Sequence, residues 1–553
     1  MNFYKSDPVL SEILEEHLDS SLWPWADEQL RRFGKLCANE IDERAVHTDR
    51  EGQPKLIKYD KMGEDISEVW VNEGYKQTIK ETYNEGIVGY IHKPIPELGR
   101  KGNYTYSYAQ GYLLSQSEPG FYCPVTLTMA TAYLMDHYAD NHLKEKYLPH
   151  VLSTGDKDLY EGATFLTERQ GGSDVGANEV KAVPEGNHYK IYGEKYFASN
   201  AGTCGVAMVL ARIEGSPKGT KGLSLFLVPW RNDDDSLNGI QIRRLKDKLG
   251  VRAVPSAEVE FNGAEAYLMG EADQGFYYMM EALNLSRVCN AVASIGIMRR
   301  AYTEAHDYAS KRRAFDHELI NYPMIKDTLV RMSVKQEVEL RTVFDMIQSF
   351  DKAASNPSLE DETTKAMNRL RIAIMKKETA EQAVHFAHES LEMHGGNGYI
   401  EDFVTPRLLR DAQVLTVWEG TANILGLEVL RLVHRYKAHE LFFQEMTRRL
   451  SFIEGLMNEV SMVTKEMSDL REWMNRILQK GKDLQTFYSK RMAQRMAILY
   501  ESVVALEAGG KGGRHRKVAE LYVHQAYAGE EFSDQPKSLQ YSDSILHDHK
   551  VLS

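Results

Sequence analysis

The segment Val417-Trp-Glu-Gly-Thr-Ala-Asn423 places one carboxylate, Glu419, directly before Gly420 and Thr421 in an otherwise apolar and hydroxyl-bearing setting. A poorly solvated carboxylate is a stronger base than one in water, because burial disfavours its charged form. Proton abstraction from carbon requires a positioned base acting together with an electrophilic sink. Glu419 is therefore the candidate base. The alternative is that Glu419 only stabilises the start of the helix that follows, as acidic residues do at helix N-termini.

A second chemically suggestive segment is Thr164–Val175, TFLTERQGGSDV. Thr167 offers a hydroxyl, Gly171 and Gly172 allow backbone amides to approach a ligand, and Ser173 offers a group that can bond a phosphate oxygen. The segment therefore suits a turn that passes close to a flat, charged ligand. As a bare string it also fits an ordinary hairpin turn.

These two segments occur together with GEKYFASN at 193–200 and MHGGNGYIEDFVTPRLLRDA at 393–412. The four blocks resemble the acyl-CoA dehydrogenase family of flavoproteins, in the family's order, and the resemblance runs from about residue 110 to about residue 435. The segment at 118–135 and the long C-terminal extension look like the AidB-type branch, which is associated with bacterial alkylation responses. The resemblance implies FAD as the cofactor and an acyl-CoA thioester as the substrate.

The resemblance also implies which residues contact FAD: Leu166, Thr167, Gly172, Ser173, Phe197, Ser199, Arg312, Phe315, Gly395, Gly396, Thr421 and Asn423. In the family, the residues matching Arg312, Phe315 and the glycine run reach a neighbouring subunit's flavin. The alternatives are a packed strand aromatic for Phe197 and a solvated cationic cluster around Arg312. Three positions depart from the usual pattern: Ser199 replaces threonine, while Asn423 and Glu392 replace glutamine.

For the substrate, the resemblance implies contacts from Ser173, Asn284, Arg287 and Gly420. Arg287 also fits a structural ion-pair partner. Some family members take their base from the helix that carries Asn284, but here that position holds Ser286, which cannot serve. On that helix, Glu281 is the only alternative candidate for the catalytic base.

A chain of 553 residues exceeds what one hydrophobic core normally spans, and it predicts several domains. Apolar residues recur at helical spacing up to about residue 160, short β-branched runs between turn residues follow, and helical patterns return from Gly275. With the resemblance, this predicts a mainly α fold with a central β-barrel. The expected domains are 1–160 (helical), 161–274 (β-barrel), 275–435 (four-helix bundle) and 436–553 (an added helical domain).

The N-terminus lacks the pattern of a secretory signal, and no run of about 18 apolar residues occurs, so we expect a cytoplasmic protein without a membrane span. The four cysteines are widely separated and predict isolated reduced thiols. The cluster His385, His388, Glu389 and His394 is interpreted as structural, so no metal is expected. No phosphate loop, nicotinamide fingerprint or hydrolase nucleophile turn is present.

Charge is uneven along the C-terminal extension. Although the whole chain carries −13, residues 471–517 hold 11 basic and 4 acidic side chains. The GGKGGRHRK run at 509–517 indicates a flexible basic loop. One hypothesis is that this stretch binds duplex DNA through phosphates. The alternative is that it pairs with the acidic residues at 518–553 or with another subunit.

The leading functional hypothesis is FAD-dependent α,β-dehydrogenation of an acyl-CoA, in which Glu419 takes the α-proton and flavin N5 accepts the β-hydride. The alternatives are an AidB-like DNA-binding flavoprotein and an acyl-CoA or lipid binder without catalysis. The resemblance implies an electron-transfer flavoprotein as the electron acceptor. Because the flavin site draws on a neighbouring chain, a homodimer or homotetramer is expected.

Overall fold

The computed structural model describes residues 1–355, 361–528 and 533–547. The chain divides into two compact units. The first contains residues 1 and 28–289, and the second contains residues 2–27 and 290–553. The boundaries fall inside two helices, α2 (Trp23–Leu36) and α9 (Gly275–Lys311).

The first unit begins with helices separated by short strands. Its helices after α2 are a π-helical turn (Cys37–Ile41), α3 (Asp42–Arg50), α4 (Glu73–Asn84), α5 (Gly89–His92), α6 (Tyr104–Leu114), α7 (Pro119–Tyr138) and α8 (Asn141–Val151). Asn72, Asn103 and Asp140 cap α4, α6 and α8, each accepting a hydrogen bond from the backbone N–H three residues later. Such caps satisfy N–H groups that a helix start leaves unpaired.

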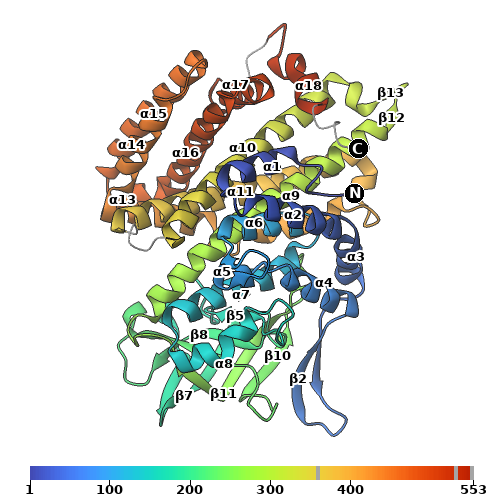
Figure 1. The fold of residues 1–553 in the computed structure, drawn as a ribbon. Helices are drawn as coiled ribbons and strands as arrows, with labels where there is room; N and C mark the ends of the chain where they lie inside the picture. The colour runs from blue at the N-terminus through green and yellow to red at the C-terminus, as the bar shows by residue number, and fades with distance from the viewer. Residues whose placement is uncertain (356–360, 529–532, 548–553) are drawn as a thin grey trace. The chain divides into compact units, whose positions relative to one another are not determined.

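A seven-stranded sheet forms the rest of the first unit. Its strands are β5 (Gly162–Phe165), β6 (Lys181–Glu185), β7 (His188–Ser199), β8 (Val206–Ile213), β9 (Leu223–Pro229), β10 (Ile240–Leu245) and β11 (Ser256–Leu268). Strand β11 pairs with β7 along most of its length and with β9 at its end, and β9 leads through β8 and β6 back to β7. This ring of pairings closes the sheet into the predicted barrel, and α7 packs along β5 (Figure 1).

The second unit is helical. Its helices are α1 (Pro8–His17), α9 from Asn290 onward, α10 (Pro323–Ser355), α11 (Glu362–His394), α12 (Thr405–Leu415), α13 (Ala422–Tyr436), α14 (Ala438–Leu450), α15 (Met457–Leu478), α16 (Lys482–Gly509), α17 (Gly513–Tyr527) and α18 (Lys537–His547). From the C-terminal extension, α16 packs against α10, α11 and α13 (Figure 1). The mainly α fold with a central barrel and added C-terminal helices is thus confirmed.

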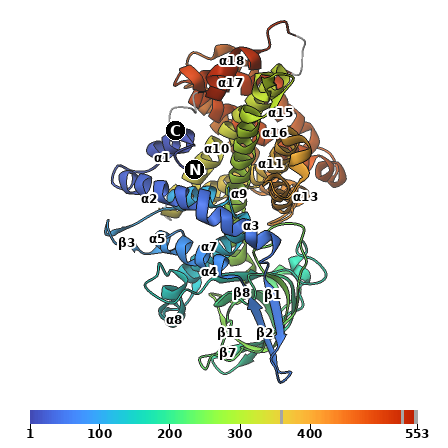
Figure 2. The same ribbon diagram turned by 90° about the vertical axis from the view of Figure 1, so that its right-hand side faces the viewer.

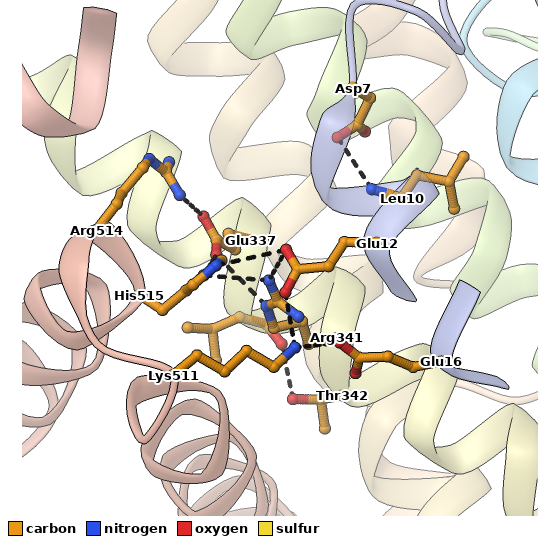
Figure 3. A network of polar contacts seen from close by, with 11 residues as sticks. Asp7, Leu10, Glu12, Glu16, Glu337, Arg341, Thr342, Lys511, Arg514 and His515 are labelled. Carbon is orange, nitrogen blue, oxygen red and sulfur yellow. Dashed lines mark hydrogen bonds and ion pairs between the residues drawn. The ribbon is translucent and has the colours of Figure 1, made fainter. Parts of the chain in front are cut away.

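A polar network joins α1, α10 and the turn between α16 and α17 (Figure 3). Its acidic members are Glu12, Glu16 and Glu337, and its basic members are Arg341, Lys511, Arg514 and His515. Glu337 is only 2% exposed. Burial favours a raised pKa for Glu337, but hydrogen bonds and charges from His515, Arg514 and Arg341 outweigh burial and hold the pKa well below its usual range.

The N-terminal segment is mainly helical, but β1 (Lys55–Tyr59) and β2 (Asp65–Trp70) form a hairpin within it (Figure 2). This hairpin packs on β10. One local prediction is wrong: the run at 509–517 is not one flexible loop. Only residues 510–512 form the turn after α16, and residues 513–517 begin α17. Lys511 and Arg514 pair with carboxylates of α1 and α10.

All four cysteines, Cys37, Cys123, Cys204 and Cys289, are free, which confirms the predicted isolated thiols. Among the described residues, we find no helix with both the length and the apolar character needed to cross a membrane.

Candidate active site

The loop after β5 forms a backbone cradle in the first unit. Leu166 and Thr167 are half-buried, whereas Gly172 and Ser173 are exposed. Gly171 has a φ of +125°, and a Cβ on Gly172 would lie 2.5 Å from Thr167 Oγ1. The loop therefore doubles back onto Thr167 and leaves the Gly172 and Ser173 backbone open, as a ligand-binding turn requires.

A buried ion pair that the sequence did not reveal fixes this loop. The Glu168 carboxylate lies 2.8 Å from Lys195 Nζ on β7 and also accepts the backbone N–H groups of Glu179 and Val180. Lys195 Nζ donates to the Leu166 carbonyl at 3.1 Å. Burial outweighs the attraction of Glu168 and lowers the pKa of Lys195 to about 8. The two residues are 27 positions apart, so no local motif indicates the pair.

Strand β7 presents Phe197 and Ser199 on one face, because alternate residues of a strand point the same way. Phe197 is 57% exposed, so the alternative of a packed aromatic does not fit it. Ser199 Oγ lies 3.3 Å from Ser256 Oγ on β11. The Tyr196 backbone N–H donates to the Thr167 carbonyl at 2.9 Å, which brings the cradle and this face together.

On α9, Arg287 is 5% exposed and its Nη1 donates to Asn284 Oδ1 at 3.2 Å. The two predicted substrate residues therefore contact each other. The reserve base, Glu281, accepts hydrogen bonds from the hydroxyls of Tyr133 and Tyr138 on α7. Burial and the nearby Glu281 raise the pKa of both tyrosines above their usual range, so both hydroxyls stay protonated donors.

In the second unit, Glu419 lies in the turn between α12 and α13. It is half-buried, and it has a φ of +59°, followed by +106° at Gly420. A left-handed conformation at a residue with a Cβ costs about 1–3 kcal/mol and persists only where the surroundings impose it. The N-cap of α13 is Thr421, two residues further on. Glu419 thus precedes the cap position.

Lys376 of α11 supports this turn, and sequence reasoning missed it. Its side chain is 1% exposed, and Nζ donates to the Gly420 carbonyl at 2.7 Å. Asn290 of α9 donates to the Leu415 carbonyl at 3.3 Å, just before the turn. Thr421 and Asn423 are exposed at the start of α13. A buried cation therefore holds the peptide that follows the candidate base.

A cavity of about 620 Å³ lies elsewhere in the second unit. Its lining includes Arg312, Gly395 and Gly396, three of the predicted cofactor residues, together with Tyr308 and Glu392. A Cβ on either glycine would meet no heavy atom within 4 Å, so the backbone is open to a bulky ligand. Glu392 places a carboxylate at this cavity, where it opposes phosphate binding.

Phe315 does not line that cavity. It is the first residue of the two-residue turn between β12 (Arg313–Ala314) and β13 (His317–Glu318), with a φ of +47° and an exposed fraction of 91%. The Tyr322 hydroxyl donates to the Phe315 carbonyl at 3.0 Å and fixes the turn. The turn therefore holds this aromatic ring outward and away from the cavity.

Comparison with known proteins gives three matches to family models. The acyl-CoA dehydrogenase C-terminal domain matches residues 273–433, the acyl-CoA dehydrogenase middle domain matches 163–264, and the adaptive response protein AidB N-terminal domain matches 1–156. Acyl-CoA dehydrogenase family member 11 of Caenorhabditis elegans is 33% identical over 442 residues, covering 78% of this chain and 70% of that protein. The chain belongs to the acyl-CoA dehydrogenase family. It is also 28% identical to the putative acyl-CoA dehydrogenase AidB of Escherichia coli K12, over 81% of this chain and 84% of that protein.

Among solved structures, this family member is similar to Caenorhabditis elegans ACDH-11 in complex with C11-CoA. The TM-score is 0.88 at 26% identity, and the match covers 99% of this chain and 95% of that one.

The histidines near the cavity have contacts of their own. His394 Nδ1 bonds the Ser390 carbonyl at 2.7 Å, and its ring lies 4.2 Å from that of Tyr308. His388, Glu389 and Glu392 offer ligand atoms within 4.8 Å of one another. His388 and Glu392 are exposed, and Glu389 is half-buried.

Much of the cationic stretch at 471–517 is engaged within the fold. Arg471, Arg495 and Arg516 face Glu440, Glu466 and Glu520, in addition to the pairs of Lys511 and Arg514 in the polar network. This pattern favours intramolecular pairing over DNA binding at Arg514 and Arg516. Most of the carboxylates that pair with the cationic stretch precede residue 518, so the acidic segment 518–553 is not their main source.

Proposed function

We propose that this family member catalyses FAD-dependent α,β-dehydrogenation of an acyl-CoA thioester, with Glu419 as the base that removes the α-proton. One observation carries the proposal. Glu419 is held in a left-handed turn whose following carbonyl is hydrogen-bonded to a buried lysine. A strained, externally fixed carboxylate is typical of a catalytic group and is not needed for helix capping.

The residues present fit FAD. The open glycine backbone at the 620 Å³ cavity, the exposed Gly172 and Ser173, and the exposed Phe197 ring offer the contacts that a flat dinucleotide requires. We assign its binding to the residues that the family resemblance implies: Leu166, Thr167, Gly172, Ser173, Phe197, Ser199, Arg312, Phe315, Gly395, Gly396, Thr421 and Asn423. Bound FAD supplies the acceptor for the β-hydride.

The chain's own residues orient the thioester and accept its α-proton. A Glu419 carboxylate oxygen takes the α-proton. Polarisation of the thioester carbonyl acidifies that proton, and we assign this to the backbone amide region at Gly420. Ser173, Asn284 and Arg287 are the proposed contacts to the rest of the acyl-CoA. We further propose an electron-transfer flavoprotein as the acceptor.

The test is anaerobic mixing of the flavin-loaded protein with saturated acyl-CoAs, including C11-CoA, while the flavin absorbance is followed. Wild type should bleach. Glu419→Gln should keep the flavin spectrum but lose at least about a hundredfold in the bleaching rate, the usual contribution of a general base. Glu281→Gln is the matched control and should bleach nearly as fast as wild type.

Equal bleaching by the Glu419→Gln variant would reject the base assignment. Bound flavin without bleaching by any acyl-CoA, combined with tight acyl-CoA binding, would identify a binder without catalysis.

A further inference from the structure

The hairpin formed by α15 and α16 exposes large apolar side chains at its tip. α15 ends at Leu478 and α16 begins at Lys482. Just inside α16, Leu484 is 49% exposed and Phe487 is 72% exposed. They are three residues apart on one helix and therefore share a face. Exposed hydrophobic side chains that share a face form a candidate surface for binding a protein or a membrane.

Cations surround these two residues. Between residues 476 and 491 the basic residues are Arg476, Lys480, Lys482, Lys490 and Arg491, and the only acidic residue is Asp483. Lys480, Lys482 and Arg491 form no ion pair with any described residue. We call residues 476–491 the tip patch. Its charge is available to a partner, unlike that of Lys511 and Arg514 in the polar network.

The end of α13 enlarges the tip patch. His434 Nε2 lies 2.7 Å from Gln485 Oε1, so this helix end adjoins the start of α16 (Figure 1). The same end of α13 contributes two further cations, Arg435 and Lys437, both exposed. Two separate segments thus bring cations to the region where α13 ends and α16 begins.

We propose that the tip patch binds an anionic lipid surface. Lysine and arginine side chains attract acidic headgroups, while Leu484 and Phe487 are placed to enter the boundary between headgroups and acyl chains. The Trp473 and Tyr488 rings meet edge-on at 5.7 Å beside Phe487, and such amphipathic rings suit the same boundary. Leu484 and Phe487 gain more from acyl chains than from a phosphate backbone, so the combination favours lipid over nucleic acid.

The experiment is co-sedimentation of the full-length, flavin-loaded protein with vesicles. One set is phosphatidylcholine alone and the other contains about 30% phosphatidylserine, with a duplex DNA shift assay in parallel. Wild type should bind the anionic vesicles and lose binding in high salt. Leu484→Ser with Phe487→Ser, and separately Lys480→Glu with Lys482→Glu, should each weaken vesicle binding by about tenfold or more.

Matched controls come from other exposed positions. Phe452 and Met457 are 74% and 69% exposed, so Phe452→Ser with Met457→Ser removes equivalent apolar surface elsewhere. Lys218→Glu with Lys465→Glu makes the same charge change at exposed positions outside residues 476–491. These controls should bind vesicles like wild type. Absence of vesicle binding, an equal loss in the controls, or DNA binding at the tip without vesicle binding would each overturn the proposal.

Discussion

At the scale of single residues, Lys376 supports the turn at Glu419. Its Nζ donates to the Gly420 carbonyl and is almost fully buried. We expect Lys376→Met to slow flavin bleaching by acyl-CoA about ten- to a hundredfold, because a small displacement of a base costs rate steeply. Stopped-flow absorbance of the flavin-loaded variant measures this.

The neighbouring Lys377 supplies the control, since it is also buried but pairs with Glu381 at 2.8 Å. Lys377→Met should lower thermal stability without a selective loss of bleaching rate. Lys376→Arg, which keeps a donor, should recover part of the rate. If both lysine-to-methionine variants lose rate in proportion to stability, Lys376 is merely structural.

At the scale of elements, the polar network attaches α1 to α10 and the α16–α17 turn (Figure 3). Glu337 has a depressed pKa in the folded state. Its contribution to stability is therefore present above its unfolded pKa, about 4.3, and is lost as pH falls toward the lower folded value. Glu337→Gln should cost about 3–5 kcal/mol near neutral pH, because it removes the buried carboxylate that faces Arg341 and Arg514.

Denaturant unfolding as a function of pH measures this effect. The loss in the Glu337→Gln variant should shrink as the pH is lowered below about 4. Glu520→Gln changes a half-buried carboxylate whose partner Arg516 is exposed, and it should cost less, about 1 kcal/mol. Equal losses in both variants would show that Glu337 stabilises the fold no more than an ordinary ion pair does.

At the scale of the whole molecule, we propose a homodimer or homotetramer in which Phe315 reaches a neighbouring chain. The residue is 91% exposed at a fixed turn. Phe315→Asp should shift the protein toward smaller assemblies and release flavin at micromolar concentration, because burying an unpaired carboxylate at an interface is costly. Light scattering and filtrate absorbance report the two effects.

Met324→Ser is a suitable control, since Met324 is 68% exposed on α10 and carries no predicted cofactor role. If Phe315→Asp retains both flavin and assembly like this control, the proposed reach of Phe315 into a partner is wrong.

The sequence by itself determined the family, the mainly α architecture with a central barrel, and the free cysteines. Helical and strand periodicities are local properties, and the four motif blocks can be recognised from the residues alone. The domain boundaries at 160, 274 and 435 and the roles of the site residues stay predictions. The β1–β2 hairpin was missed because it depends on packing against β10, far along the chain.

Only the tertiary structure decided which charges act together. The pairs Glu168 with Lys195, Glu337 with Arg514, and Gly420 with Lys376 join residues separated by 27 to 177 positions. Charges counted along 471–517 appeared as one basic stretch, yet folding engages Lys511 and Arg514 internally and leaves Lys480 and Lys482 exposed. Composition counts charges, whereas their availability depends on which carboxylates the fold brings within reach.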